Sequence, residues 1–118
     1  MRLQRFEDLE AWQLARVLTR LIYQIKFGPD RRLRDQVTAA AVSVMNNIAE
    51  GFDSQSNLEF IRFLRYSRRS CSEVQNCLYV AVDQSVISEE GFQSLYLQTE
   101  RTRQVIDGLL RYLRAKRA

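Results

Sequence analysis

A run of twenty residues, LRDQVTAAAVSVMNNIAEGF from Leu33 to Phe52, constrains the fold of this chain more than any other feature. Its apolar side chains recur at steps of three and four residues, which is the spacing of one face of an α-helix. Alanines in that face let a neighbouring helix approach closely. We therefore expect the face to be buried, and it consists of Leu33, Val37, Ala40, Ala41, Val44 and Ile48.

Polar residues accompany this apolar face. Ser43, Asn47 and Glu50 share one side of the expected helix, where they form either a binding site or a set of hydrogen bonds between packed helices. The second interpretation is favoured, because Ser and Asn between helices usually satisfy backbone groups. Gly51 is expected to end the helix in a left-handed cap.

Periodicity and capping residues predict four helices, over about residues 8–25, 31–50, 57–83 and 89 onward. Asp30 and Ser88 are expected N-caps, and Gly28-Pro29 separates the first two helices. Short loops favour antiparallel neighbours, so the sequence predicts an all-α, up-down-up-down four-helix bundle as a single domain of residues 1–118. The residues expected to face inward outside the second helix include Leu14, Val17, Leu18, Ile22, Phe60, Phe63, Leu64, Val80, Leu97 and Leu110.

The inventory of reactive residues argues against an enzyme. The chain has no histidine, so the commonest general base and metal ligand is missing. Its four glycines form no phosphate-binding motif, and its acids are not paired in an apolar context. We therefore expect no catalytic residues, no cofactor and no metal.

The cysteines and the hydropathy of the chain predict the cellular compartment in which it is found. Cys71 and Cys77 lie on opposite sides of the expected third helix and are poorly placed to bond each other, so we expect two buried thiols in a reducing cytoplasm. No apolar run approaches the ~20 residues of a membrane span, so no membrane contact is expected. Trp12 is interpreted as a core or interface anchor.

Positive charge is carried almost entirely by arginine. The net charge is +4, and Lys26 and Lys116 are the only lysines among 18 cations. Arginine binds phosphate and carboxylate in bidentate fashion, which favours anionic partners or interface ion pairs, although a GC-rich genome has the same effect on composition. The segment from residue 101 onward holds six cations against the single acid Asp107, an arrangement that also suits the negative end of a helix dipole.

The third helix carries the sharpest candidate for a functional surface. Arg62, Arg65 and Arg69 share one face, with Arg68 and Tyr66 beside them, and guanidiniums next to an aromatic ring track a phosphate backbone and stack bases. The alternative is a solvated stripe whose ends Glu59 and Glu73 neutralise, leaving Arg65 and Arg68 uncompensated. The candidate nucleic-acid-binding residues are Arg62, Arg65, Arg68, Arg69, Arg111 and Arg114.

Aromatic residues exceed what the core of a small bundle holds. Some of them must reach the surface or an interface, which favours a homo-oligomer. The residues concerned are Tyr23, Phe27, Tyr66, Tyr79, Phe92, Tyr96 and Tyr112.

The motifs together resemble the helical-bundle family encoded by intervening sequences in bacterial 23S rRNA genes. The central run keeps ten residues of that family's typical pattern, Gln36, Ala40, Ala41, Val42, Ser43, Asn47, Ile48, Ala49, Glu50 and Gly51. FEDLEAWQLA at residues 6–15 is similar to the family's opening, and EFIRFLRYSRRSCSE at residues 59–73 to its third helix. The chain departs from the pattern in having Thr38 and Ala39 for two basic residues, Met45 for proline, and Arg69 for glycine.

The resemblance implies a ring-like homopentamer of four-helix bundles. It extends to the accessory protein of diversity-generating retroelements, and so implies a reverse transcriptase and its template RNA as partners. Two functions follow as hypotheses. One is a non-enzymatic, homo-oligomeric scaffold that binds RNA, DNA or a reverse transcriptase/RNA complex. The other is a protein-protein interaction module with no nucleic-acid binding.

Overall fold

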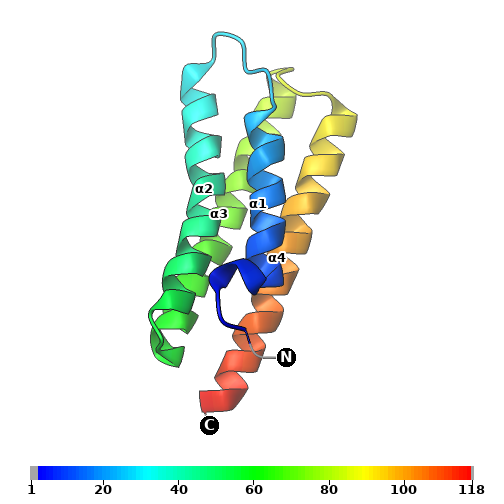
Figure 1. Ribbon diagram of the computed structural model, residues 1–118. Coiled ribbons are helices and arrows are strands. Elements are labelled where there is room, and N and C mark those ends of the chain that lie inside the picture. Colours follow the sequence, from blue (N-terminus) through cyan, green and yellow to red (C-terminus); the bar gives the residue numbers. More distant parts are fainter. Residues whose placement is uncertain (1–2, 118) are drawn as a thin grey trace.

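Four antiparallel helices make up the fold, as the spacing of apolar residues predicts. The computed structural model describes residues 3–117 of the chain, and the side chains of residues 3–116 (Figure 1). Each helix packs on two neighbours in the cyclic order α1, α2, α3, α4, and the particle measures 47 × 21 × 21 Å. The elements are η1 (Phe6–Asp8), α1 (Glu10–Tyr23), α2 (Arg31–Asp53), α3 (Asn57–Asp83) and α4 (Glu89–Arg117).

Short side-chain caps fix where three of the helices begin. The carboxylate of Asp30 accepts a hydrogen bond from the backbone N–H of Leu33 at 3.1 Å, and the hydroxyl of Ser88 accepts one from Gly91 at 3.0 Å, so both expected caps are confirmed. Ser56 caps α3 in the same way. The first helix is shorter than predicted, because a 3-10 turn over Phe6–Asp8 precedes it and it ends at Tyr23.

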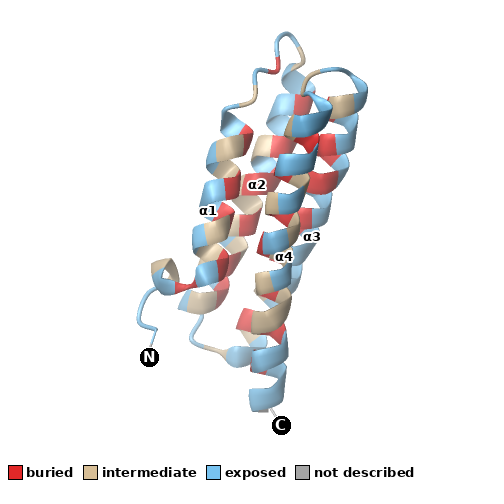
Figure 2. Cartoon of the chain, turned by 90° about the vertical axis from the view of Figure 1, so that its right-hand side faces the viewer, coloured by how far each residue is buried: buried red, intermediate tan, exposed pale blue. Residues whose placement is uncertain are grey.

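The apolar face of α2 is buried as expected, and its six residues are all in the core. Buried residues lie on the inner faces of all four helices (Figure 2). They form two apolar clusters, one around Leu18, Val37 and Leu78, the other around Ile48, Leu64 and Ile106. The helix runs unbroken through Met45, which packs against the second cluster.

Three residues that were expected to face inward are on the surface instead. The side chains of Val17, Val80 and Leu97 are exposed, with Leu97 at 55%. In α1 the buried positions are Ala11, Ala15, Leu18 and Ile22, and the two alanines are small enough to let the helix lie close to its neighbours. A prediction of burial from apolar identity alone therefore assigned too many residues of these helices to the core.

Aromatic residues divide between core and surface. Phe27 and Phe92 are buried, and Tyr96 is half-buried. The tyrosine side chains that remain exposed are Tyr23, Tyr66, Tyr79 and Tyr112. The expectation that part of the aromatic set reaches the surface is confirmed.

Gly51 does not end α2, contrary to the prediction from its sequence context. The helix continues to Asp53, and the residue with positive φ at this turn is Gln55, at 58°. A Cβ on Gly51 would lie 2.8 Å from Cδ1 of Phe60 and 2.9 Å from Cβ of Phe63. Glycine is needed here because α3 approaches the backbone of α2 too closely to leave room for a side chain.

We predict that Gly51→Ala lowers the free energy of unfolding by about 1 kcal/mol, because overpacking at a close helix contact costs about 1–3 kcal/mol and exceeds the gain in helix propensity. Gly108→Ala is the matched control within α4, where the nearest atom to an added Cβ is 3.7 Å away. It should gain roughly 0.5–1 kcal/mol. Urea unfolding measures the change in the free energy of unfolding for both variants. An equal increase in the two would show that α2 and α3 move apart freely at Gly51.

Candidate nucleic-acid interface

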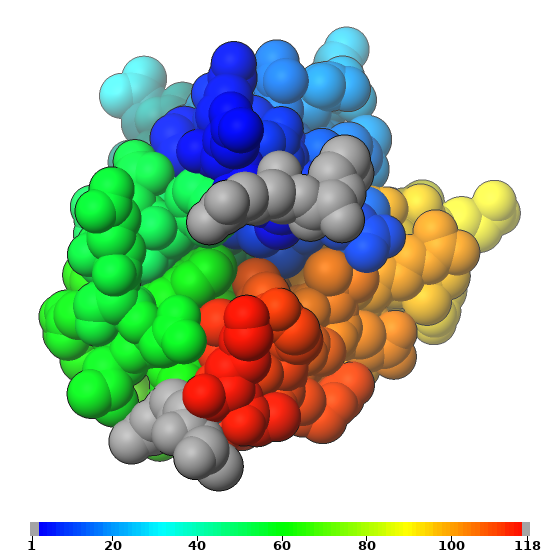
Figure 3. All heavy atoms as spheres, turned by 60° about the horizontal axis from the view of Figure 1, so that its bottom comes forward, coloured from blue at the N-terminus to red at the C-terminus, as the bar shows by residue number. Residues whose placement is uncertain are grey.

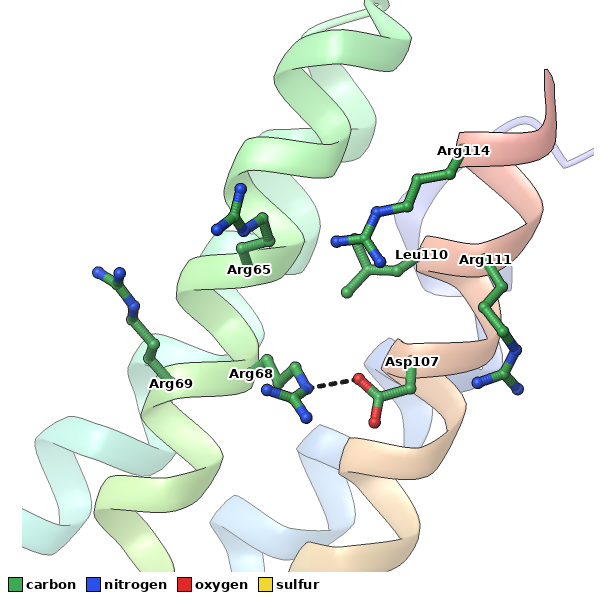
Figure 4. Close-up of a pocket in the computed structure, with 7 residues that line it drawn as sticks. All are labelled: Arg65, Arg68, Arg69, Asp107, Leu110, Arg111 and Arg114. Atoms are coloured by element: carbon green, nitrogen blue, oxygen red, sulfur yellow. Dashed lines mark hydrogen bonds and ion pairs between the residues drawn. The ribbon is translucent and has the colours of Figure 1, made fainter. Parts of the chain in front are cut away.

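Arginines from α3 and α4 meet in one groove on the outside of the bundle. The groove has a volume of about 410 Å³ and a floor formed in part by Leu110 (Figure 4). We call it the arginine groove, and it is lined by Arg65, Arg68, Arg69, Asp107, Leu110, Arg111 and Arg114. Five of the six candidate binding residues are therefore brought together within one chain.

The antiparallel course of α3 and α4 creates this arrangement. Arg68 and Arg114 point toward the space between the helices, while Arg69 and Arg111 extend from their outer sides (Figure 4). The end of α4 lies next to the turn that joins α2 to α3, as the view of that end of the bundle shows (Figure 3). The result is a broad positive surface, and periodicity within one helix could not predict that the arginines of α4 lie beside those of α3.

The charge of Arg68 is compensated, which corrects the expectation that it stands free. Its Nε donates a hydrogen bond to Oδ1 of Asp107 at 2.6 Å, and both side chains are partly exposed. An ion pair at such a position contributes about 0–1 kcal/mol to stability. Asp107 is the one carboxylate among the described residues that line the groove, so its principal effect is on the local charge.

Four of the arginines that line the groove are unpaired within the part of the chain that the structure describes. Among the side chains of residues 3–116, none forms an ion pair or hydrogen bond with Arg65, Arg69, Arg111 or Arg114. Five arginines and one aspartate therefore leave four unbalanced positive charges on this surface. Unpaired guanidiniums gathered in a groove attract phosphate or carboxylate groups.

Arg62 lies to one side of the arginine groove. Its guanidinium donates to Oε1 of Glu59 at 2.6 Å and to the Tyr66 hydroxyl at 3.1 Å. The hydrogen bond with Arg62 lowers the pKa of Glu59 and raises that of the guanidinium. The expected neutralisation by Glu59 is confirmed, whereas Glu73 forms no ion pair within the described residues.

Ser43 and Asn47 of α2 have a structural role, whereas the side chain of Glu50 is exposed. The Asn47 side chain donates to the Ser43 backbone carbonyl at 2.9 Å and to its hydroxyl at 3.0 Å, and Ser70 of α3 donates to the same hydroxyl at 2.9 Å. Buried Ser67 donates to the carbonyl of Val44. These bonds satisfy polar groups between α2 and α3, as the favoured interpretation of the sequence predicts.

The remaining candidate residues are placed in the interior or at a packing contact. Cys71 and Cys77 are both buried free thiols, and burial raises the pKa of Cys71 to about 12. The rings of Trp12 and Phe6 meet edge to face at 5.3 Å, so Trp12 anchors the segment before α1.

The described residues contain no grouping of three potential metal ligands. No helix in this part of the chain has the length and apolarity needed to cross a membrane.

A second contact between α3 and α4 escaped prediction. Gln75, which is buried, donates to Oε1 of Glu100 at 2.9 Å, and Arg103 donates to the other carboxylate oxygen at 2.9 Å. Both hydrogen bonds lower the pKa of Glu100, and the bond from Arg103 has the larger effect. The polar residues were visible in the sequence, but only the pairing of the two helices brings them together.

Comparisons with known proteins agree with this fold. The family model described as 23S rRNA-intervening sequence protein matches residues 7–108. A solved structure of a protein with unknown function from the S23 ribosomal protein family of Bacteroides thetaiotaomicron superposes with a TM-score of 0.76 at 17% identity. The match covers 85% of this chain and 97% of that one, and at such identity it shows the fold alone. No curated protein sequence matches. Because the family model covers most of the helical bundle, the chain belongs to the 23S rRNA-intervening sequence protein family.

Proposed function

We propose that this protein is a non-enzymatic, homo-oligomeric scaffold that binds RNA through the arginine groove. The observation that carries the proposal is the set of four arginines on adjoining faces of α3 and α4 that have no partner among the described residues. Arginine forks hold phosphate oxygens with two hydrogen bonds, and release of counterions from the nucleic acid supplies the free energy of binding.

Assembly of several chains strengthens the binding of a nucleic acid by a groove that carries only a modest charge. Four unbalanced charges on one chain give weak, salt-sensitive binding, but several grooves in one particle engage the same nucleic acid together. Exposed Tyr79, Leu97 and Tyr112 supply apolar surface for contacts between chains. The specific form of the proposal is a cytoplasmic homopentamer that holds the RNA of a reverse transcriptase complex.

An interaction module without nucleic-acid binding is the second candidate. The same groove fits acidic side chains of a partner protein, because guanidinium forks hold carboxylates as they hold phosphates. Within the chain itself, Arg68 already holds the carboxylate of Asp107 through one hydrogen bond. Salt-dependent binding to nucleic acid separates the two candidates.

We expect binding of the wild type to RNA to weaken with salt, with a log-log slope of roughly −0.7 for each neutralised phosphate of a single strand. The double variant Arg65→Gln with Arg114→Gln should make the slope shallower by about 1.4. Arg20→Gln with Arg32→Gln removes two exposed charges elsewhere and should leave the slope nearly unchanged. Fluorescence anisotropy at several salt concentrations measures all three.

Two results would contradict this expectation. If the wild type shows no salt-sensitive binding to RNA or DNA, the interaction module takes the place of the nucleic-acid scaffold. If the variant with Arg65 and Arg114 replaced loses its oligomeric mass, these arginines form ion pairs between chains.

Asp107→Asn should strengthen binding to RNA. The change removes the one carboxylate in the groove and frees Arg68, so we expect a slope steeper by about 0.7 and a higher affinity at low salt. Asp35→Asn is the control, because it makes the same change in net charge and breaks an exposed ion pair with Arg34. Equal effects from both variants would mean that binding follows net charge and not the groove.

The assembly state is tested by light scattering at micromolar concentration. We expect a mass five times that of the 13.9 kDa chain. A mass of one chain across that concentration range would refute the oligomer, and another multiple would refute the pentamer alone.

A further inference from the structure

Arg65 and Arg69 stand between two hollows. On one side is the arginine groove, and on the other is a smaller hollow of about 270 Å³. We call this the tyrosine hollow, and its lining consists of Arg62, Arg65, Tyr66 and Arg69. The side chains of Arg65 and Arg69 rise from the same side of α3 (Figure 4). A ligand held by these two arginines therefore has an aromatic ring beside it.

The ring of Tyr66 is held in place by its neighbours. It meets the ring of Phe63 edge to face, with centroids 6.1 Å apart and planes at 88°. Its hydroxyl accepts a hydrogen bond from Arg62 at 3.1 Å, and Arg62 is itself held by Glu59. The side chain remains 38% exposed. An exposed aromatic ring that is already ordered loses little conformational entropy when a ligand stacks on it.

We propose that the tyrosine hollow receives the base of an unpaired nucleotide, an inference that rests on the proposed function. The base stacks on Tyr66, and the flanking phosphates lie on Arg65 and Arg69, which are about 6 Å apart along the helix axis. In a duplex the faces of the bases are covered by their neighbours, so a protein ring reaches them only in single strands, loops and ends. The site therefore selects single-stranded over double-stranded RNA.

The spacing of charge and ring argues against an acidic peptide as the ligand. Carboxylates would use the guanidiniums of both hollows and would gain nothing from the ring of Tyr66. A flat base with a phosphate on either side uses Arg65, Tyr66 and Arg69 together, while Arg62 orders the ring.

The test compares a single-stranded oligouridine RNA of about 12 nucleotides, carrying one central 2-aminopurine, with a blunt RNA duplex of the same length. We expect the single strand to bind more tightly and the 2-aminopurine fluorescence to fall on binding, because the base stacks. Tyr66→Leu should weaken single-strand binding roughly fivefold or more and abolish the quenching, since a stacked base contributes about 1–3 kcal/mol. It should leave binding of the duplex unchanged.

Two variants control for the loss of the ring. Tyr66→Phe keeps the aromatic face and should retain both affinity and quenching, although it loses the hydrogen bond from Arg62. Tyr23→Leu removes an exposed tyrosine at the far end of α1 and should have no effect. Circular dichroism establishes that each variant keeps its helices.

The outcomes distinguish this inference from the proposed function. If the duplex binds as tightly as the single strand through Arg65 and Arg114, or if Tyr66→Leu changes neither affinity nor fluorescence, the inference is overturned and the scaffold function stands. If neither RNA shows salt-sensitive binding, both proposals fail.

Discussion

The register between α3 and α4 determines where every residue of the arginine groove lies. Two hydrogen bonds report it, from Gln75 to Glu100 and from Arg68 to Asp107. The second pair lies seven residues back along α3 and seven forward along α4, so both belong to one antiparallel register, two helical turns apart. Apolar contacts supply most of the free energy of this packing. The buried amide of Gln75 favours this register over its neighbours, because an unsatisfied buried donor costs about 1–3 kcal/mol.

Much of the fold was predictable because its helices are long and strongly periodic. The apolar face of α2 is buried residue for residue, and the capping residues Asp30 and Ser88 mark true helix starts. Gly51 was misread because a glycine after a helical run is usually a cap, and only the approach of α3 shows why it is needed inside the helix. Val80 and Leu97 were misplaced because apolar identity does not tell which apolar residues a neighbouring helix covers.

The candidate site was predictable only where it depends on one helix. The common face of Arg62, Arg65 and Arg69 follows from their spacing, and the structure groups all three around the tyrosine hollow. The neutralisation of Arg68 by Asp107 did not follow, since these residues are far apart in sequence and meet through the packing of α3 on α4. Arg111 and Arg114 were candidates from the sequence, but the tertiary structure was required to show that they line the same groove as the arginines of α3.

The bundle interior and its outer face have different chemistry for a physical reason. Small residues between the helices, such as Ala41, Gly51 and Ser67, allow the helices to pack closely. Guanidiniums cannot enter such an interior without partners, so the unpaired arginines remain on the surface, where salt screens them over about 8–10 Å. A surface of this kind binds weakly as a single copy. The proposed function therefore couples the groove to assembly, since binding through several copies at once raises the overall affinity.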